Sequence, residues 1–435
     1  MLNLPFYAAI PFVLMLLAIA IAPLFAEHFW EKNRNKLIIV LILAVPTAIY
    51  MLSKGLNHEL EHQMFADYVP FIVLLAALFT ITGGIHLSGD LMAKPLTNTL
   101  FLLVGFLLAS IMGTTGAAMM LIRPLLNTNQ QRKYKTHTVL FFIAAVANCG
   151  GLLTPLGDPP LLLLYLRGVP FEWFMHLLPM WAMTGAMLLT IYYFVDKYYF
   201  FKREEWTAIS AEMREKVPLR IGGKINFIYL LLVVLSVAFI NETYIKSMAD
   251  EHANIFIKHL RDIILVIIGV LSLLTTKNKV RELNRFSWTP ILEVAILFLG
   301  IFVTMCPALL LLRAHAAEFG LSQAWHFYYA SGALSSFLDN APTAVVFYNL
   351  GVEMPAVTPF LNVADGTISE ILLKAIAIGS VFFGAMTYIG NGPNFMIKAI
   401  ADEQKVPMPS FFGYIFTFSL IVLLPIYVIV QLIFF

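Results

Sequence analysis

Two polar segments, residues 154–160 and 387–393, interrupt apolar stretches of the chain and share the pattern Thr-x-(Leu/Ile)-Gly-(Asp/Asn)-x-Pro. Helices interrupted at corresponding places in two halves of a chain are typical of the binding sites of secondary transporters. Asp158 lies in the first segment. An aspartate at membrane depth usually marks an ion or proton pathway, because its charge is costly to bury in hydrocarbon.

A second pair of polar interruptions lies midway in two further apolar segments. Residues 97–125 contain Gly-Thr-Thr-Gly at 113–116, and residues 323–350 contain Asp-Asn-Ala-Pro-Thr starting at Asp339. We interpret both segments as re-entrant helical hairpins, which reach the middle of the membrane and return to the same side.

The two aspartates have the chemistry of an exchange site. Asp158 and Asp339 each lie in a break where backbone carbonyl groups are unpaired, and hydroxyl groups are nearby in the sequence. These oxygens suit a hard cation such as Na⁺, and a buried carboxylate can hold a proton instead, which is the minimal requirement for exchange. We therefore predict Na⁺ at Asp158 and Asp339. Each aspartate could also cap a helix, since Asp is a favoured N-cap.

The other candidate ligands carry hydroxyl or amide groups or lie at the breaks, and amides offer both donors and acceptors. They are Thr114, Thr115, Thr154, Gly157, Asn340, Thr343, Thr387, Gly390, Asn391 and Asn394. Asn148 could equally be an amide that serves packing.

Two further ionisable residues are candidates for a proton relay. Glu293 lies early in an apolar span, where it could relay protons or simply face the interface. Lys398 follows the second break and could be a counter-ion, although lysines near helix ends more often extend to water.

Composition places the chain in a membrane. The sequence is 60% hydrophobic and 12% charged, against about 25% charged residues in soluble domains. The net charge of +2 gives no reason to expect nucleic-acid binding. Cys149 and Cys306 lie in apolar segments and are predicted to be buried thiols. We expect no cofactor beyond Na⁺ and H⁺.

Apolar runs of the roughly 17–25 residues needed to cross a bilayer predict ten crossings. They fall at residues 6–25, 37–52, 68–86, 138–166, 174–196, 226–241, 259–275, 288–312, 370–400 and 411–433. The first run lacks the basic flank and cleavage site of a signal peptide, so we interpret it as a membrane helix.

The loop charges predict an orientation. Basic residues gather at 32–36, 132–135, 197–224 and 277–285, which we place in the cytoplasm by the positive-inside rule. Ten crossings then put both termini outside a cytoplasmic (inner) membrane. The first hairpin enters from the cytoplasm and the second from outside.

Three landmarks recur in the same order and predict an inverted repeat. Pro70 pairs with Pro290, Thr114 with Asn340 and Thr154 with Thr387, at offsets of 220, 226 and 233 residues. The paired helices run in opposite directions, and such repeats place the substrate site at their interface.

The predicted organisation has five parts. They are N-terminal scaffold helices (1–64), a first repeat (65–196, hairpin 97–125, broken helix 138–166), a cytoplasmic linker (197–225), scaffold helices (226–285) and a second repeat (286–435, hairpin 323–350, broken helix 370–400).

A zinc-protease pattern is present but poorly placed. His58-Glu59-Leu60-Glu61-His62 fits H-E-x-x-H, the pattern of a zinc-dependent protease. It lies in a charged loop between two spans, and no third ligand is apparent. We therefore do not expect an enzyme, although the loop could bind a metal or sense pH.

The order of helices, hairpin and broken helix, repeated in inverted form, resembles the ion transporter superfamily. Gly-Gly-x-x-Thr-Pro-x-Gly-Asp (150–158) and Leu-Asp-Asn-Ala-Pro-Thr (338–343) are most similar to motifs of the NhaD-type Na⁺/H⁺ antiporters. A branch described as citrate transporters and the INDY-like dicarboxylate symporters are also similar. The dicarboxylate symporters carry Ser-Asn-Thr at both tips, and NhaD-type proteins have hydroxyl residues where this chain has Pro159-Pro160. The resemblance implies a homodimer with a fixed scaffold and a moving transport domain, as in an elevator.

The sequence therefore predicts an all-α polytopic membrane protein that acts as a Na⁺/H⁺ antiporter. The alternative is a Na⁺- or H⁺-coupled symporter of an organic anion such as citrate or a dicarboxylate. Two acidic residues and almost no arginine in the core favour a cation, since anion sites usually contain a guanidinium group.

Overall fold

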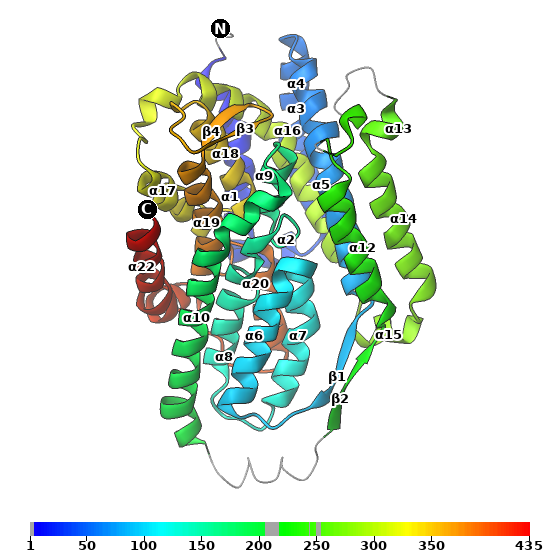
Figure 1. Cartoon of the computed structure of the whole chain (residues 1–435), viewed down its shortest axis with the longest axis vertical. Helices are drawn as coiled ribbons and strands as arrows, with labels where there is room; N and C mark the ends of the chain where they lie inside the picture. Colours follow the sequence, from blue (N-terminus) through cyan, green and yellow to red (C-terminus); the bar gives the residue numbers. More distant parts are fainter. Residues whose placement is uncertain (1–3, 205–216, 243, 249–253) are drawn as a thin grey trace.

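The computed structural model of the chain describes residues 4–204, 217–242, 244–248 and 254–435, and these are predominantly helical (Figure 1). The helices up to residue 195 are α1 (Ile10–Phe25), α2 (Glu27–Trp30), α3 (Asn33–Ser53), α4 (Asn57–His62), α5 (Val69–Thr82), α6 (Pro95–Met112), α7 (Thr114–Thr128), α8 (Thr136–Ala145), α9 (Pro159–Leu166) and α10 (Leu178–Val195). They are followed by α12 (Ile225–Phe239), α13 (Ile255–Lys258), α14 (Leu260–Thr275), α15 (Asn278–Leu283), α16 (Thr289–Ala314), α17 (Ala324–Phe337), α18 (Asn340–Val352), α19 (Glu370–Phe383), α20 (Gly392–Glu403), α21 (Phe411–Tyr414) and α22 (Leu424–Phe434).

Shorter 3₁₀ and π segments extend or join these helices. They are η1 (Phe6–Ala9), η2 (Gln63–Tyr68), η3 (Cys149–Leu153), η4 (Phe171–Leu177), η5 (Asp196–Phe200), η6 (Phe201–Arg203), η7 (Lys246–Met248), η8 (Ala316–Phe319), η9 (Gly384–Met386) and η10 (Ile415–Leu423).

The helices present apolar side chains outward as well as inward. Large exposed residues include Ile42 on α3, Leu274 on α14 and Leu432 on α22. Helices that are apolar on all sides are stable in lipid but not in water. In the described part of the chain, eight helices are long and apolar enough to cross a membrane. The prediction of an all-α polytopic membrane protein is confirmed.

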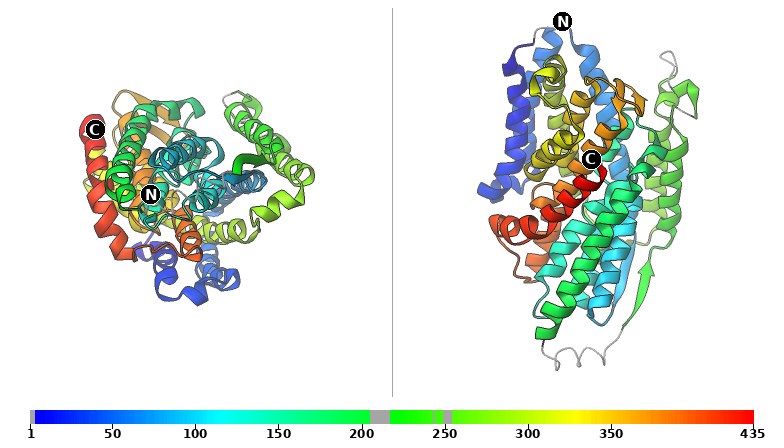
Figure 2. Two further views of the ribbon diagram at one scale, coloured as in Figure 1. Left: turned by 90° about the horizontal axis from the view of Figure 1, so that it is seen from below. Right: turned by 60° about the vertical axis from the view of Figure 1, so that its left-hand side comes forward.

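Some expected crossings are made by helices shorter than a full span. α12 has 15 residues, α14 has 16, and the last broken helix consists of α19 and α20 with 14 and 12 residues. Conversely, α6 is long enough to span, although we expected it as one arm of a hairpin. α12 and α14 pack on α5 at the edge of the molecule, as two further views show (Figure 2).

Both hairpins are present, in opposite halves of the molecule (Figure 1). α6 and α7 pack together and are separated only by Gly113, whose φ of +80° is readily adopted by glycine. α17 and α18 pack together and are separated by Leu338 and Asp339. The side of the membrane from which each enters stays a prediction.

Each broken helix resumes beside the hairpin of the other repeat. α8 ends before η3, and α9 then packs on α18 of the second hairpin. α19 ends before η9, and α20 packs on α7 of the first hairpin. The two repeats are therefore interleaved, and the four helices α7, α9, α18 and α20 begin near one another.

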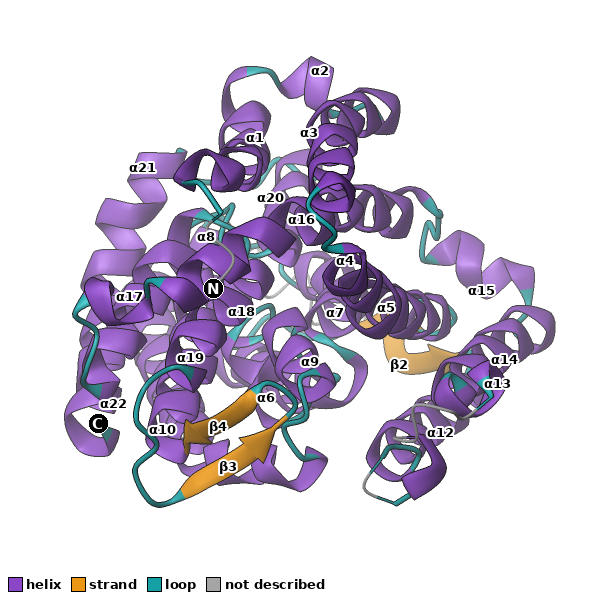
Figure 3. Ribbon diagram, turned by 90° about the horizontal axis from the view of Figure 1, so that it is seen from above, coloured by secondary structure: helices purple, strands orange, loops and turns teal. Residues whose placement is uncertain are grey.

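Two short antiparallel ribbons were not predicted. β1 (His86–Asp90) pairs with β2 (Val217–Gly222), and β3 (Phe360–Val363) pairs with β4 (Gly366–Ser369). The second ribbon covers one end of the helices (Figure 3), and the first lies toward the other end (Figure 1). β2 belongs to the predicted linker 197–225, of which residues 205–216 lie outside the described part.

The H-E-x-x-H segment is helical, not a loop as predicted. Residues 57–62 form α4, which continues through η2 into α5. Within the described ranges, no group of three or more His, Cys, Asp or Glu side chains could share a metal ion.

A cluster of ion pairs joins the segment before α5, the end of α9, the end of α16 and the β3–β4 turn. Arg167, at the end of α9, pairs with Asp67 at 2.6 Å and with Asp365 at 3.1 Å. Arg313, at the end of α16, pairs with Asp365 at 2.7 Å. Burial raises the pKa of Asp365, but the two guanidinium groups more than offset this, so its pKa is lower than usual.

The glycine of each Gly-(Asp/Asn) motif allows a close backbone approach at the break. A Cβ added to Gly157 would lie 1.9 Å from the carbonyl oxygen of Gly151, and one added to Gly390 would lie 2.6 Å from that of Gly384. The offset between these pairs is 233 residues in both cases, equal to that of Thr154 and Thr387. The repeat therefore extends to the backbone contacts inside the breaks.

Replacing Gly157 by alanine should destabilise the fold, because the new methyl group overlaps backbone atoms that cannot move independently. We expect Gly157→Ala to cost about 3 kcal/mol or more, at the upper end of overpacking substitutions. Gly392→Ala is the matched control, since a Cβ there would meet no atom within 4 Å. Thermal unfolding of the purified protein measures both, and equal melting temperatures for the two variants would contradict the prediction.

Candidate functional site

Asp158 is the centre of a hydrogen-bond network that joins both repeats. Its Oδ1 accepts hydrogen bonds from Thr114 Oγ1 at 2.7 Å and from Asn391 Nδ2 at 3.1 Å. Its Oδ2 accepts one from Asn340 Nδ2 at 2.5 Å. Asp158 as a residue is 2% exposed. The two hairpin tips and the second broken helix thus converge on the aspartate of the first broken helix.

These contacts follow from where the helices begin. Thr114 is the first residue of α7, Asn340 is the first of α18, and Asn391 directly precedes α20. The backbone N–H of Thr114 also donates to the carbonyl oxygen of Gly157 at 2.8 Å, which holds the first hairpin tip against the break. Sequence reasoning predicted Asp158 and these three partners, and the structure brings them together.

Two further amides, those of Asn148 and Asn394, extend the network beyond Asn391. Asn391 Nδ2 also donates to Asn148 Oδ1 at 3.2 Å, and Asn148 Nδ2 donates to Asn394 Oδ1 at 2.8 Å. Asn394 in turn donates to the carbonyl oxygens of Gly384 and Thr387. Asn148 was not among our candidate ligands, although an amide just before the Gly-Gly-x-x-Thr motif was a usable signal.

The two threonines of the repeated motif play equivalent parts. Thr154 Oγ1 donates to the carbonyl oxygen of Ser110, and Thr387 Oγ1 donates to that of Ser336 at 2.5 Å. Each hydroxyl also accepts a hydrogen bond from the backbone N–H two residues later, at 3.2 Å. These threonines bind the breaks to the hairpins, and among the hydrogen bonds of the described residues neither threonine is bonded to Asp158.

Asp339 lies at the second hairpin tip but outside this network. Its Oδ1 accepts from the backbone N–H of Ala341 at 3.1 Å, so it caps α18. Thr343 Oγ1 donates back to the carbonyl oxygen of Asp339 at 3.0 Å. Thr115 is half-buried, and its side chain forms no hydrogen bond within the described ranges. An ionic role for Asp339 stays a prediction.

One buried acceptor beside Asp158 has no partner. Among the described residues, Asn340 Oδ1 is buried without a hydrogen bond, while the amide nitrogen of the same side chain binds Asp158. A cation next to the carboxylate would satisfy this oxygen, and the hydroxyl of Thr114 offers a further ligand. The residues present therefore fit a small hard cation such as Na⁺.

The same place is favourable for negative charge. The residues that cap α7, α9, α18 and α20 are Gly113, Asp158, Asp339 and Asn391. Each helix N-terminus carries a partial positive charge of about +0.5. Together they stabilise the Asp158 carboxylate, and they would equally stabilise an anionic substrate group.

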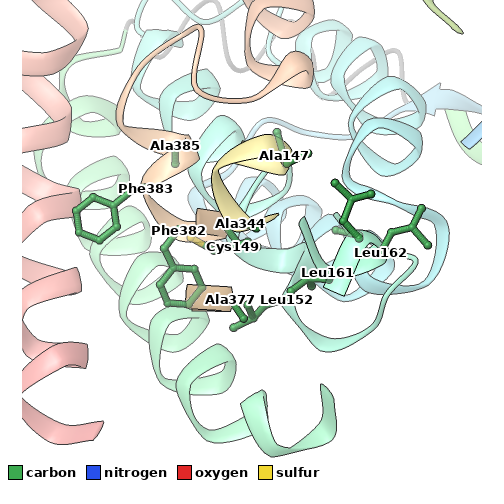
Figure 4. Close-up of a cluster of buried hydrophobic side chains, with 14 of the residues drawn as sticks. Ala147, Cys149, Leu152, Leu161, Leu162, Ala344, Ala377, Phe382, Phe383 and Ala385 are labelled. Carbon is green, nitrogen blue, oxygen red and sulfur yellow. The ribbon is translucent and has the colours of Figure 1, made fainter. Parts of the chain in front are cut away.

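The surroundings of the breaks are apolar. Cys149 and Leu152 of η3, Leu161 of α9, Ala344 of α18 and Phe382 of α19 belong to one buried cluster, drawn from both repeats (Figure 4). Both cysteines are free and buried, as predicted. Apolar walls exclude water, so electrostatic interactions inside them are strong.

The two candidate relay residues have other partners. Glu293 on α16 pairs with the buried Lys36 of α3 at 2.5 Å. Lys398 on α20 pairs with Asp402, one turn later, at 2.7 Å. Both contacts stabilise helices, and neither residue bonds directly to Asp158 or Asp339.

Comparison with known proteins decides the family. The chain matches, over residues 1–435, a family described as "Putative citrate transport". The protein belongs to this citrate-transport family. It is also similar to the inner membrane protein YbiR of Escherichia coli (strain K12), with 29% identity over 132 residues. That match covers 28% of this chain and 35% of the relative's length. The family confirms the resemblance to the ion transporter superfamily and identifies a multi-pass membrane transporter.

Removing the Thr114 hydroxyl should weaken the network, since a hydrogen bond to a buried charge contributes about 1.5–3 kcal/mol. We expect Thr114→Val to lower the melting temperature of the purified transporter clearly. Thr115→Val should change it little, because that neighbouring hydroxyl has no hydrogen bond among the described residues. A larger effect of Thr115→Val than of Thr114→Val would mean that the hairpin tip is held differently.

Proposed function

We propose that this member of the citrate-transport family exchanges Na⁺ for H⁺ at a single site centred on Asp158. The observation that carries the proposal is the buried carboxylate next to an unpaired amide oxygen, that of Asn340. Within the described part of the chain, the hydrogen-bond partners of Asp158 are neutral, and no lysine or arginine pairs with it. The charge of this carboxylate is therefore available to a cation.

Competition for one carboxylate supplies the coupling. With Na⁺ bound, Asp158 is ionised, and oxygens of Thr114 and Asn340 complete the ligand set. With a proton bound, the carboxyl group is neutral and cannot hold Na⁺ well. Because the three hydrogen-bond donors come from both hairpin tips and the second broken helix, a change at Asp158 acts on both repeats at once. A conformational change that both repeats share is what alternating access requires.

The second candidate function is symport of an organic anion such as citrate, coupled to Na⁺ or H⁺. Two observations favour it: the family description, and the four helix N-termini that begin around the site. These N-termini can bind a carboxylate without an arginine. In this case Asp158 binds the coupling cation, and the substrate lies beside it.

The decisive test uses proteoliposomes that contain a trapped pH dye and an acid interior. For the exchanger, external Na⁺ alone should dissipate the pH gradient, and Asp158→Asn should abolish this because the neutral amide can neither ionise nor carry a proton. If Na⁺ alone has no effect and citrate with Na⁺ or H⁺ produces flux, the exchanger proposal fails and the symporter replaces it.

Asp339→Asn is the matched comparison, because asparagine keeps the helix cap while removing the charge. Loss of exchange in this variant would assign the charge of Asp339 to ion binding. Retained exchange would restrict the ion site to Asp158. Asp402→Asn serves as a control, since this acidic residue lies on the exposed end of α20 and pairs with Lys398.

A further inference from the structure

A cavity of about 470 Å³ lies away from Asp158, at the end of the molecule that carries the β1–β2 ribbon. Its lining residues belong to β1, α7, the segment that precedes α16 and the end of α20. The polar side chains that line it include His86, Ser88, Arg123, Asn127, Arg285 and Glu403. A cavity of this size accommodates a small organic molecule.

The cavity has an excess of positive charge. Arg285 forms an ion pair with Glu403, so these two charges offset each other. Arg123, on α7, is half-buried and has no hydrogen bond or ion pair to any described residue. Glu403 is the nearby opposite charge, but its carboxylate is paired with Arg285. Within the part of the chain that the structure describes, the Arg123 guanidinium therefore makes none of the fork-like hydrogen bonds to a carboxylate or phosphate that this group normally makes.

The opposite end of the molecule, which carries the β3–β4 ribbon, shows what such a partner looks like. There Asp365, from the turn between β3 and β4, lies between Arg167 and Arg313 at 3.1 and 2.7 Å. At the β1–β2 end two arginines also line one space with a carboxylate, that of Glu403, but among the described residues this carboxylate forms an ion pair with Arg285 and not with Arg123. An external carboxylate would complete at this end the arrangement that Asp365 completes at the other.

Two helices connect the cavity to the central site around Asp158. Arg123 follows Thr114 by nine residues on α7, which is about 13 Å along the helix. Glu403 is the last residue of α20, the helix that begins beside Asn391. The helices α7 and α20, which line the cavity, are thus two of the four helices that begin around Asp158.

We propose that this cavity binds a small soluble anion with carboxylate groups, and that Arg123 is its principal ligand. The proposal is independent of exchange at Asp158. The anion is either a substrate captured before transport or an effector bound at the entrance. The phosphate of an anionic lipid would also bind a guanidinium group. We favour a soluble ligand because Arg123 lies among the polar residues that line the cavity.

The test measures citrate binding by calorimetry to the full-length protein in nanodiscs that contain only phosphatidylcholine. Arg123→Gln should weaken citrate binding about ten-fold or more, as expected when a charged hydrogen-bonding partner is lost. Arg123→Lys should lose less, because it keeps the charge but not the fork. Arg34→Gln, an exposed arginine on α3, should bind like the wild type.

Two further arms separate the alternatives. Asp158→Asn should retain citrate binding; if it loses binding while Arg123→Gln does not, the anion binds at the central site and the proposal is overturned. If citrate does not bind, and only nanodiscs with phosphatidylglycerol raise the melting temperature in an Arg123-dependent way, the cavity takes a lipid phosphate and the proposal fails. If proteoliposomes show no Na⁺/H⁺ exchange, the exchange proposal is refuted, but the outcome of the citrate and lipid measurements is unchanged.

Discussion

The rest of the structure depends on holding one ionisable carboxyl group in an apolar interior. Asp158 is buried, its described partners are neutral, and its surroundings are apolar. An ionised group in such a place is very costly unless hydrogen bonds and dipoles replace the lost water. Three hydrogen-bond donors and four helix N-termini make that replacement. The donors lie at the starts of α7, α18 and α20, and Asp158 itself precedes α9. Both hairpins and both broken helices therefore contribute to the arrangement.

The same constraint explains why the two halves are not identical. Asn391 occupies in the second repeat the place that Asp158 occupies in the first, and the two side chains lie 3.1 Å apart. Two ionised carboxylates at that distance would repel strongly in an apolar environment. An amide at one of the two positions turns this repulsion into a hydrogen bond. The duplicated backbone is therefore retained, while the chemistry of one side chain differs.

The two ends of the molecule differ in how deeply their ion pairs are buried. Asp67 and Arg167 join the segment before α5 to the end of α9, and both are almost fully buried, at 2% and 6% side-chain exposure. Arg285 and Glu403 join the segment before α16 to the end of α20, with the charges reversed and exposures of 64% and 52%. One end is thus packed around its ion pairs, and the other encloses a cavity.

The sequence by itself determined the membrane class, the two hairpins, the two helix breaks and most of the residues that bond to one another around Asp158. These features have local causes: apolar runs of membrane length, and Gly, Pro, Asp and Asn where a helix cannot continue. Tertiary structure alone decided which aspartate is central, since Asp158 and Asp339 have the same local signals. It also decided that Asn148 joins the network, that Glu293 and Lys398 pair elsewhere, and that residues 57–62 are helical. Most of these outcomes depend on contacts between residues far apart in the chain. Asp158 and Asn340, for example, are 182 positions apart, and a local sequence pattern carries no information about which distant residues meet.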